Sequence, residues 1–361
     1  MFKYEPARIF EEHQAFCDLP FTKLILNGWG DVSMCCYQLE QIGSVLNGES
    51  LLDLWRSAKA KEIRKTTEEN RLHRVCKSWN TCPFQVKQPA PGPVRAYKDC
   101  DYPTWLEICL PNTHCNIGGE TPSEDNPACI MCCRNFDFKP QPPITDMLCE
   151  KAKPLMPYLE RLCVLGVAEP FWKDATFKVF EKLEFSRWKH RCRFETNNNG
   201  VCLTPHVTDR FFEEVTYSEI SFSLDAATPG TYMKIRRHDL YDMVVENLAY
   251  FVQQRNKYGG PQNHKVVIYN NINLLNVDEM SKMVVTAAKC GVDQITMIPT
   301  HDQCGRVFLG ELLLNEKNVK LFKKNSEDAM KMAQQLGVPI HYPKPFDVVP
   351  PPVGDLVNIT I

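Results

Sequence analysis

Between residues 104 and 300 the sequence alternates short apolar segments with longer amphipathic ones, and this alternation limits the chain to few folds. The apolar segments predict six strands, and the segments between them predict helices. Strands that alternate with helices form right-handed βαβ units, whose strands are parallel. Six units are too few for the eight-stranded closed barrel. We therefore expect an α/β fold, an open partial (β/α)6 barrel of parallel strands.

The expected elements follow one another without an internal repeat. The expected strands are residues 104–110, 163–167, 191–196, 218–225, 265–272 and 293–299. The expected helices are residues 144–162, 172–183, 204–215, 231–256, 276–291 and 325–336, and one more over residues 50–72 has Ser50 as its N-cap. Because parallel α/β folds bind ligands at the C-terminal ends of their strands, residues just after each strand are candidate site residues.

Composition and charge predict the domain boundaries and the location of the protein. A Pro-rich segment over residues 83–103 predicts a linker, so we expect an N-terminal Cys-rich domain with linker (1–100), an α/β core (101–310) and a C-terminal helix with a Pro-rich tail (311–361). The formal charge of -2 gives no electrostatic reason to expect nucleic-acid binding. The sequence has no apolar run of about 20 residues for a membrane span, and charges interrupt the place of a signal peptide. We expect a cytoplasmic protein.

Cysteine is the unusual component, with 17 residues in the chain. In the cytoplasm thiols stay reduced, so metal ligation or catalysis is a better explanation than disulfide bonds. Thiolates are soft ligands that favour zinc, copper(I) or iron–sulfur clusters. Cys163, Cys192 and Cys290 lie in apolar or amphipathic segments and are interpreted as small core residues.

Three cysteines follow the first expected strand of the core. Cys115, Cys129 and Cys132 can hold a [4Fe–4S] cluster and leave its fourth iron open, whereas a structural zinc site needs four protein ligands. Two alternatives stay open at this point. Cys109 or Cys133 can replace one member of the triplet, or four of these cysteines can hold zinc.

The loop resembles the cluster loop of the radical S-adenosylmethionine (SAM) superfamily. The segment Cys129-Ile130-Met131-Cys132 matches the second half of that motif, in which an aromatic or apolar residue follows the second cysteine. The first half departs, because thirteen residues separate Cys115 from Cys129 where the family usually has three. Residues 118–127 have the composition of a loop insertion, and such a lengthening costs only about 1 kcal/mol in closure entropy.

Further segments resemble the family in the order in which they occur. Residues 165–171 resemble its Gly-Gly-Glu-Pro turn, and residues 196–200 resemble its Thr-Asn-Gly turn. Residues 221–236 are similar to the Ser-(aliphatic)-Asp…Tyr-x-x-(aliphatic)-Arg signature of the SPASM branch. The resemblance implies that the first turn holds the SAM amino group and that Ser223 and Arg236 hold its carboxylate and ribose. The implied cofactor-binding residues are Gly166, Ala168, Glu169, Pro170, Asn198, Ser223, Asp225 and Arg236.

The N-terminal cysteines resemble a SPASM or twitch domain, which binds auxiliary iron–sulfur clusters. The implied ligands of one auxiliary cluster are Cys17, Cys35, Cys76 and Cys82, with Cys36 and Cys100 as spare candidates. In the family this domain normally follows the core, and here it precedes the core. Zinc on the same four cysteines is the alternative.

The resemblance implies an enzyme that cleaves SAM reductively. An external one-electron donor such as flavodoxin or ferredoxin reduces the cluster, and the 5′-deoxyadenosyl radical abstracts hydrogen from a peptide, protein or small-molecule substrate. Two other functions stay open: a non-catalytic binding or scaffold protein stapled by zinc or iron–sulfur clusters, and a decayed relative that keeps its clusters without activity. The sequence assigns no catalytic side chain.

Overall fold

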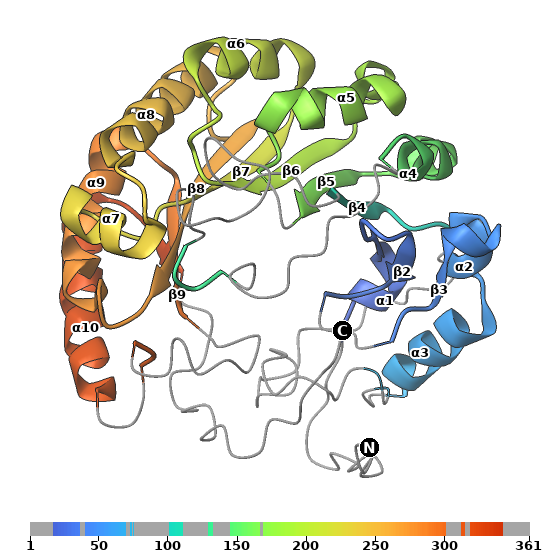
Figure 1. Ribbon diagram of the computed structural model, residues 1–361, viewed down its shortest axis with the longest axis horizontal. Helices are drawn as coiled ribbons and strands as arrows, with labels where there is room; N and C mark the ends of the chain where they lie inside the picture. Colours follow the sequence, from blue (N-terminus) through green and yellow to red (C-terminus); the bar gives the residue numbers. More distant parts are fainter. Residues whose placement is uncertain are drawn as a thin grey trace. The chain divides into compact units, whose positions relative to one another are not determined.

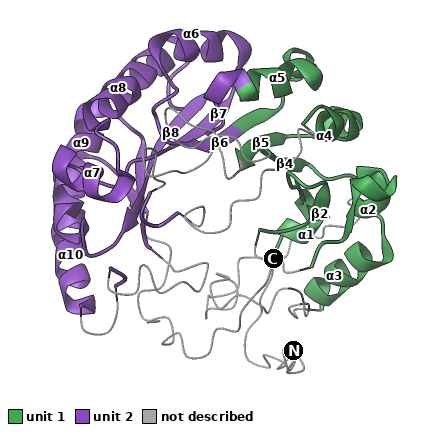
Figure 2. Cartoon of the chain, viewed as in Figure 1, with its two compact units in different colours: residues 1–112, 141–166, 175–194 green, residues 113–140, 167–174, 195–361 purple. Residues whose placement is uncertain are grey.

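The computed structural model describes residues 17–36, 40–69, 73, 75, 101–110, 129–132, 145–166, 169–300, 312–314 and 318–341. The chain forms two compact units, which Figure 2 colours separately. Unit 1 comprises residues 1–112, 141–166 and 175–194, and unit 2 comprises residues 113–140, 167–174 and 195–361. The units are defined by contacts in space, and the domain boundaries expected from the sequence at residues 100 and 310 stay a prediction.

The strands of unit 1 lie in the order β3-β2-β1-β4-β5 (Figure 1). β1 pairs in parallel with β4, and β4 pairs in parallel with β5, whereas β2 and β3 are antiparallel additions. All four residues of β1 are buried, as expected for a parallel strand covered on both faces. The strands are β1 (Lys23–Leu26), β2 (Asp31–Ser33), β3 (Gly43–Ser44), β4 (Trp105–Leu110) and β5 (Arg161–Gly166).

The sequence predicts where the first long helix of unit 1 begins, but not where it is interrupted. Ser50 caps α2 with a full capping box to Asp53, which confirms the predicted N-cap. The predicted single helix over residues 50–72 is wrong, because Ser57 caps a second helix, α3. The elements are α1 (Leu19–Thr22), η1 (Val45–Asn47), α2 (Leu51–Trp55), α3 (Ala58–Glu68), α4 (Thr145–Ala152), η4 (Lys153–Tyr158), α5 (Ala175–Lys182) and η6 (Phe185–Arg187).

The segment before β5 also differs from its predicted form. The sequence predicts one helix over residues 144–162, but α4 ends at Ala152 and a 3-10 helix with Pro154 near its start and Pro157 inside follows it. A proline lacks the amide hydrogen that an α-helix interior requires, so the two prolines explain the change. β5 consequently begins at Arg161, two residues before the predicted strand.

Unit 2 has its strands in the order β10-β9-β8-β7-β6, and β7, β8, β9 and β10 pair in parallel. The prediction of an α/β fold with parallel strands is therefore confirmed. The strands are β6 (Arg193–Asn198), whose last four residues belong to unit 2, β7 (Ser218–Ser223), β8 (His264–Ile272), β9 (Gln294–Pro299) and β10 (Ile340–His341).

The helices of unit 2 lie along one face of its strands, as α6, α8 and α9 show in Figure 1. Phe251 on α8 contacts both Phe211 on α6 and Phe222 on β7 in the buried layer between helices and strands. The predicted helix over residues 231–256 is split, because Arg237 adopts a left-handed conformation and ends α7. The elements are η5 (Trp172–Asp174), α6 (Pro205–Glu214), α7 (Pro229–Arg236), α8 (Tyr241–Lys257), η7 (Val277–Glu279), α9 (Met280–Cys290) and α10 (Val319–Leu336).

An ion pair between a buried arginine and a half-buried aspartate lies at the N-terminal ends of the unit 2 strands. Arg255 on α8 binds the carboxylate of Asp293 and donates to the carbonyl of Gly291, while Asp293 accepts the amide hydrogen of Val266. The pair ties α8 to the starts of β8 and β9, so ligand chemistry is expected at the opposite, C-terminal ends. No helix in the described ranges is both long and apolar enough to cross a membrane.

Candidate functional site

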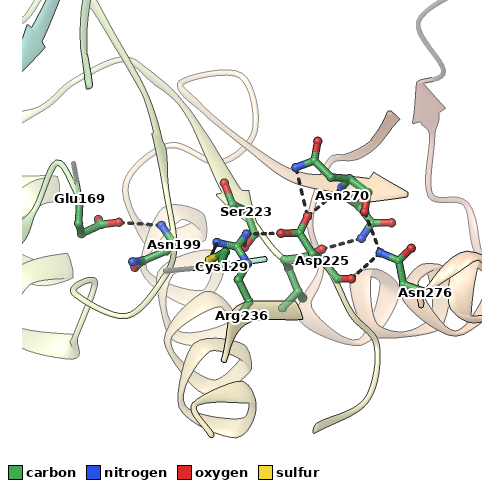
Figure 3. A network of polar contacts seen from close by, with 10 residues as sticks. Cys129, Glu169, Asn199, Ser223, Asp225, Arg236, Asn270 and Asn276 are labelled. Atoms are coloured by element: carbon green, nitrogen blue, oxygen red, sulfur yellow. Dashed lines mark hydrogen bonds and ion pairs between the residues drawn. The ribbon is translucent and has the colours of Figure 1, made fainter. Parts of the chain in front are cut away.

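A fully buried carboxylate, Asp225, lies just beyond the C-terminal end of β7 (Figure 3). Its Oδ2 forms an ion pair with Nη2 of Arg236 at 2.5 Å, and its Oδ1 accepts the backbone N–H of Asn271 at 2.8 Å. A buried charge is tolerated when it is paired and hydrogen-bonded in this way. The predicted strand over residues 218–225 is two residues too long, so Asp225 belongs to the loop and not to the face of β7 that carries Ser223.

Arg236 connects this carboxylate to the cysteine loop. It occupies the last turn of α7 and is 8% exposed. Its Nη2 donates to the carbonyl oxygen of Ser223 at 2.6 Å, and its Nη1 donates to Sγ of Cys129 at 3.7 Å. Two motifs more than a hundred residues apart therefore meet through a single side chain.

The cysteine loop is also attached to α7 by its backbone. The amide nitrogen of Ile130 donates to the carbonyl oxygen of Ile235 at 3.0 Å, and Cys132 donates to the carbonyl of Cys129 at 2.9 Å. Cys129 is buried and Cys132 is half-buried. Cys115 lies outside the described residues, and among those described no three His, Cys, Asp or Glu side chains stand together as metal ligands.

Glu169 is a second buried carboxylate at this end of unit 2. Its Oε2 accepts the amide hydrogen of Asn199 at 2.8 Å, whereas its Oε1 has no hydrogen-bond partner among the described residues. Burial raises the pKa of Glu169 to about 7, against the opposing effects of backbone N–H groups at Asn199 and Phe171 and of Arg236. A buried oxygen that lacks a donor is suited to accept one from a ligand.

The other residues of the turn that contains Glu169 are Gly166, Ala168 and Pro170. Pro170 is buried, and Glu169 accepts the amide of Trp172 through its backbone carbonyl at 3.1 Å. Gly166 is the last residue of β5 in unit 1. Ala168 lies outside the described residues.

The turn after β6 holds Asn199 in position for its hydrogen bond to Glu169. Asn198 donates from Nδ2 to the carbonyl of Ser221 at 3.0 Å, and its Oδ1 accepts the amide of Gly200 at 2.8 Å. The side chain of Asn198 therefore shapes the turn, and the backbone of Asn199 meets Glu169. The resemblance selects Asn198, and the role of Asn199 was missed because a backbone contact leaves no signal in residue type.

Gly200 is expected to be intolerant of a side chain, and Gly200→Ala tests the turn. Its φ is +79°, and an added Cβ meets Cγ1 of Val244 at 2.8 Å. The left-handed backbone and the crowding together predict a loss of about 2–4 kcal/mol in the free energy of unfolding, measured by denaturant titration. The matched control is Gly230→Ala in α7, where nothing lies within 4 Å, and it should be neutral or stabilising. Equal stability of the two variants would contradict the assigned strain.

A third buried carboxylate, Glu279, fixes the loop between β7 and α7. It accepts hydrogen bonds from the amide of Ala227 at 2.8 Å, from Oγ1 of Thr228 at 2.6 Å and from Oγ1 of Thr231 at 2.8 Å. Thr228 is also the N-cap of α7. The helix that carries Arg236 is thus held at its start by a residue that sequence reasoning did not identify.

Asparagines at the C-terminal end of β8 and just after it complete the network. Asn270 donates to the carbonyl of Leu224 at 2.8 Å, and Asn276 donates to the carbonyls of Asp225 at 2.6 Å and Asn271 at 2.7 Å (Figure 3). The sequence makes residues after each strand candidates for ligand binding but assigns none of the side chains in this segment. The run of asparagines at the C-terminal end of a buried strand was the available signal.

The N-terminal cysteines belong to unit 1. Cys17 and Cys35 are half-buried, and Cys76 and Cys82 lie outside the described residues. Between the first two, Asn27 accepts the amides of Trp29 and Asp31 through Oδ1, and Gly30 has a φ of +83° that favours glycine.

Cys109 is surrounded in unit 1 by groups that disfavour its thiolate form. Glu107, paired with Lys23 at 2.7 Å in a buried ion pair, lies 3.6 Å from Sγ of Cys109. Burial and the carboxylate of Glu107 raise the pKa of Cys109. A metal ligand must be a thiolate, so this surrounding disfavours Cys109 as a replacement member of the triplet.

Comparison with known protein families identifies the N-terminal region. Residues 17–83 match the model of the SPASM family, an iron-sulfur cluster-binding domain. The predicted SPASM-type region is therefore confirmed. No curated protein sequence matches the chain.

Solved structures give weaker likenesses. SuiB from Streptococcus suis aligns with a TM-score of 0.47 and 12% identity, over 80% of this chain and 54% of that chain. The enzyme anSMEcpe with bound AdoMet aligns with a TM-score of 0.49 and 14% identity, over 66% and 64%. A radical SAM methyltransferase from Sphaerobacter thermophilus aligns with a TM-score of 0.42 and 14% identity, over 67% of each. The chain spans about half of the SuiB chain, and scores below 0.5 do not establish a shared activity.

Proposed function

We propose that this chain is a radical SAM enzyme with an N-terminal auxiliary cluster domain. The observation that carries the proposal is the meeting of separate motifs at one end of unit 2. Arg236 of the β7–α7 motif contacts Cys129 of the cysteine loop, and Glu169 contacts Asn199 of the turn after β6. The iron-sulfur family match over residues 17–83 supports the same class. The alternative is a binding or scaffold protein stapled by zinc or iron–sulfur clusters.

Cys115, Cys129 and Cys132 are proposed to hold the SAM-binding [4Fe–4S] cluster. The surroundings of Cys129 fit a thiolate ligand, because the guanidinium of Arg236 points a donor at its sulfur in a buried position. The half-buried Cys132 follows on the same short turn.

Glu169 is proposed to bind the amino group of SAM. Its Oε1 lacks a partner among the described residues, and an ammonium group is a charge-assisted donor to a buried carboxylate. Gly166, Ala168 and Pro170 complete the proposed turn, and Asn198 shapes the facing one. Ser223, Asp225 and Arg236 complete the proposed cofactor-binding set.

Held by Cys115, Cys129 and Cys132, a reduced cluster would supply the electron that cleaves SAM to methionine and a 5′-deoxyadenosyl radical, and that radical would abstract a hydrogen atom from the substrate. The chain would hold and orient the cofactor through the buried side chains of Glu169, Asp225 and Arg236. We propose a peptide, protein or small molecule as the substrate, and flavodoxin or ferredoxin as the electron donor. A reducing cytoplasm suits a chain with 17 cysteines.

Iron and sulfide quantification on anaerobically purified protein, with a SAM-cleavage assay on the same sample, tests the proposal. Brown protein that releases 5′-deoxyadenosine after reduction is the expected result. Colourless protein that contains zinc and leaves SAM intact would establish the scaffold alternative. Brown protein without SAM cleavage would identify a decayed relative.

The auxiliary cluster is tested separately by Cys35→Ala. Loss of one of four thiolate ligands is expected to lower the iron content by about four atoms per chain, the content of one [4Fe–4S] cluster. The matched control is Cys163→Ala, which removes a buried cysteine of β5 in the same unit and should keep the wild-type iron content. Equal iron in Cys35→Ala and wild type would remove the N-terminal cluster from the proposal.

A further inference from the structure

The guanidinium of Arg236 contacts the carboxylate of Asp225, the carbonyl of Ser223 and the sulfur of Cys129. Asp225 forms an ion pair with the guanidinium, the carbonyl of Ser223 accepts a hydrogen bond from Nη2, and Sγ of Cys129 accepts one from Nη1 at 3.7 Å. The side chain is 10% exposed, and that of Asp225 is fully buried. Arg236 is thus already held by protein groups at the position where the resemblance implies a SAM ligand.

The contact to Cys129 is supported from both directions. On the arginine side, Asp225 is fixed by Asn271, whose backbone N–H and Nδ2 both donate to Oδ1, so the ion pair has little freedom to move. On the cysteine side, the amide of Ile130 binds the carbonyl of Ile235, the residue before Arg236. Two consecutive residues of α7 therefore hold two consecutive residues of the cysteine loop, one through its backbone and the other through its side chain.

We propose that Arg236 is a positioning residue for the cluster, which orients Cys129 by an N–H···S hydrogen bond and raises the reduction potential of the iron–sulfur cluster bound there. The inference rests on the proposed function, since it assumes a cluster on Cys129. Reduction adds negative charge to a cluster, and hydrogen bonds to its sulfurs stabilise the reduced form and raise the potential.

Arginine suits this position better than lysine. A planar guanidinium presents five N–H donors in a fixed fork, so it can serve a carboxylate, a carbonyl and a sulfur at the same time. An ammonium group at the same place would be drawn to Asp225 and would have to leave the sulfur. The carboxylate of Asp225 also offsets the charge of Arg236. The effect of the hydrogen bond on the reduction potential can therefore be measured separately from the effect of the net charge.

The test is the midpoint potential of the cluster in the full chain, measured without SAM by a redox titration followed by electron paramagnetic resonance. Arg236→Gln is expected to make reduction about tenfold less favourable, a shift of about 59 mV to lower potential for a one-electron couple. The double variant Arg236→Gln/Asp225→Asn keeps the net charge of the pair and still removes the fork, so it should show the hydrogen-bond part of the shift. Arg237→Gln, which removes an equal charge at the next residue, is the control and should keep the wild-type potential.

Arg236→Lys is the second variant, and it decides the matter if Arg236→Gln does not fold. It should lower the potential, because the ammonium stays with Asp225. Wild-type potentials in every folded Arg236 variant, together with weaker SAM binding, would overturn the inference and leave Arg236 with the role of a SAM contact alone. Failure of the proposed function is a different result, since the wild-type protein itself would then show no cluster signal.

Discussion

Replacement of Cys129 by alanine is expected to reduce the release of 5′-deoxyadenosine from SAM to the level of a sample without protein. The proposed cluster has three protein ligands, and the loss of one leaves two, which cannot retain the cubane at the site. The buried Sγ of Cys129 also accepts the hydrogen bond from Arg236, so the substitution removes the contact that orients the loop. The measurement is chromatographic quantification of 5′-deoxyadenosine after anaerobic reduction with dithionite.

Cys290→Ala is the matched control for Cys129→Ala. Cys290 is another buried cysteine of unit 2, at the end of α9, where burial raises its pKa and keeps it a thiol. SAM cleavage by this variant should equal that of the wild type. Unchanged cleavage in Cys129→Ala would remove Cys129 from the ligand set and, with it, the proposed site.

The second large effect is expected for Glu169→Gln. A charge-assisted hydrogen bond contributes about 1.5–3 kcal/mol, so loss of the carboxylate charge should weaken SAM binding by roughly 10- to 150-fold. The neutral amide still accepts the backbone N–H of Asn199, so the turn is preserved while the charge is lost. Equilibrium dialysis of reconstituted protein with labelled SAM measures the change.

The same residue predicts how SAM binding depends on pH. Because the pKa of Glu169 is raised to about 7, a large fraction of the protein carries a neutral carboxyl group below that pH. SAM affinity should therefore rise by about eightfold between pH 6 and pH 7.5, as the ionised fraction grows. The free energy of unfolding of the SAM-free protein should change in the opposite direction. The folded state holds the proton of Glu169 more tightly than the unfolded state, so this free energy falls as pH rises from 4.5 to about 7.

Glu219→Gln is the matched control for both measurements. Glu219 lies near the start of β7, far along the strand from the site, and forms an ion pair with Lys265. Its removal should leave SAM affinity and its pH dependence unchanged. A pH profile in Glu169→Gln that matches the wild-type profile would exclude Glu169 as the titrating group.

The main strands and helices were predictable because each is long enough to show its period. The six strands expected from apolar segments correspond to β4 through β9, within two residues at each end. The short strands β1, β2, β3 and β10 were missed, since two to four residues display no alternation. β1 pairs with β4 across an intervening segment of almost eighty residues, and such pairing leaves no local signal.

The breaks within helices were predictable only where a residue forces them. Pro154 and Pro157 explain the change from α4 to η4, and both prolines are visible in the sequence. By contrast, Arg237 ends α7 in a left-handed conformation that arginine does not favour. The tertiary contacts of α7, above all the bonds to Glu279, determine where that helix lies.

The site was predictable in its residue types and not in its connections. Glu169, Asp225 and Arg236 were selected by resemblance, and they are buried at one end of unit 2. The supporting contacts of Glu279, Asn199 and Asn276 involve backbone groups or residues distant in sequence, so no motif spacing predicts them. Sequence motifs thus locate candidates, and packing assigns their partners.

Two asparagines, one in β8 and one just after it, have a consequence for measurements on the intact protein. Asn270 and Asn276 hold the neighbouring loop with neutral amide groups, which neither gain nor lose protons in the working range of an enzyme. Such links are also insensitive to ionic strength, unlike surface ion pairs. Acidification or added salt therefore leaves these amide hydrogen bonds in place, and a titration midpoint near neutrality is expected to come from Glu169 instead.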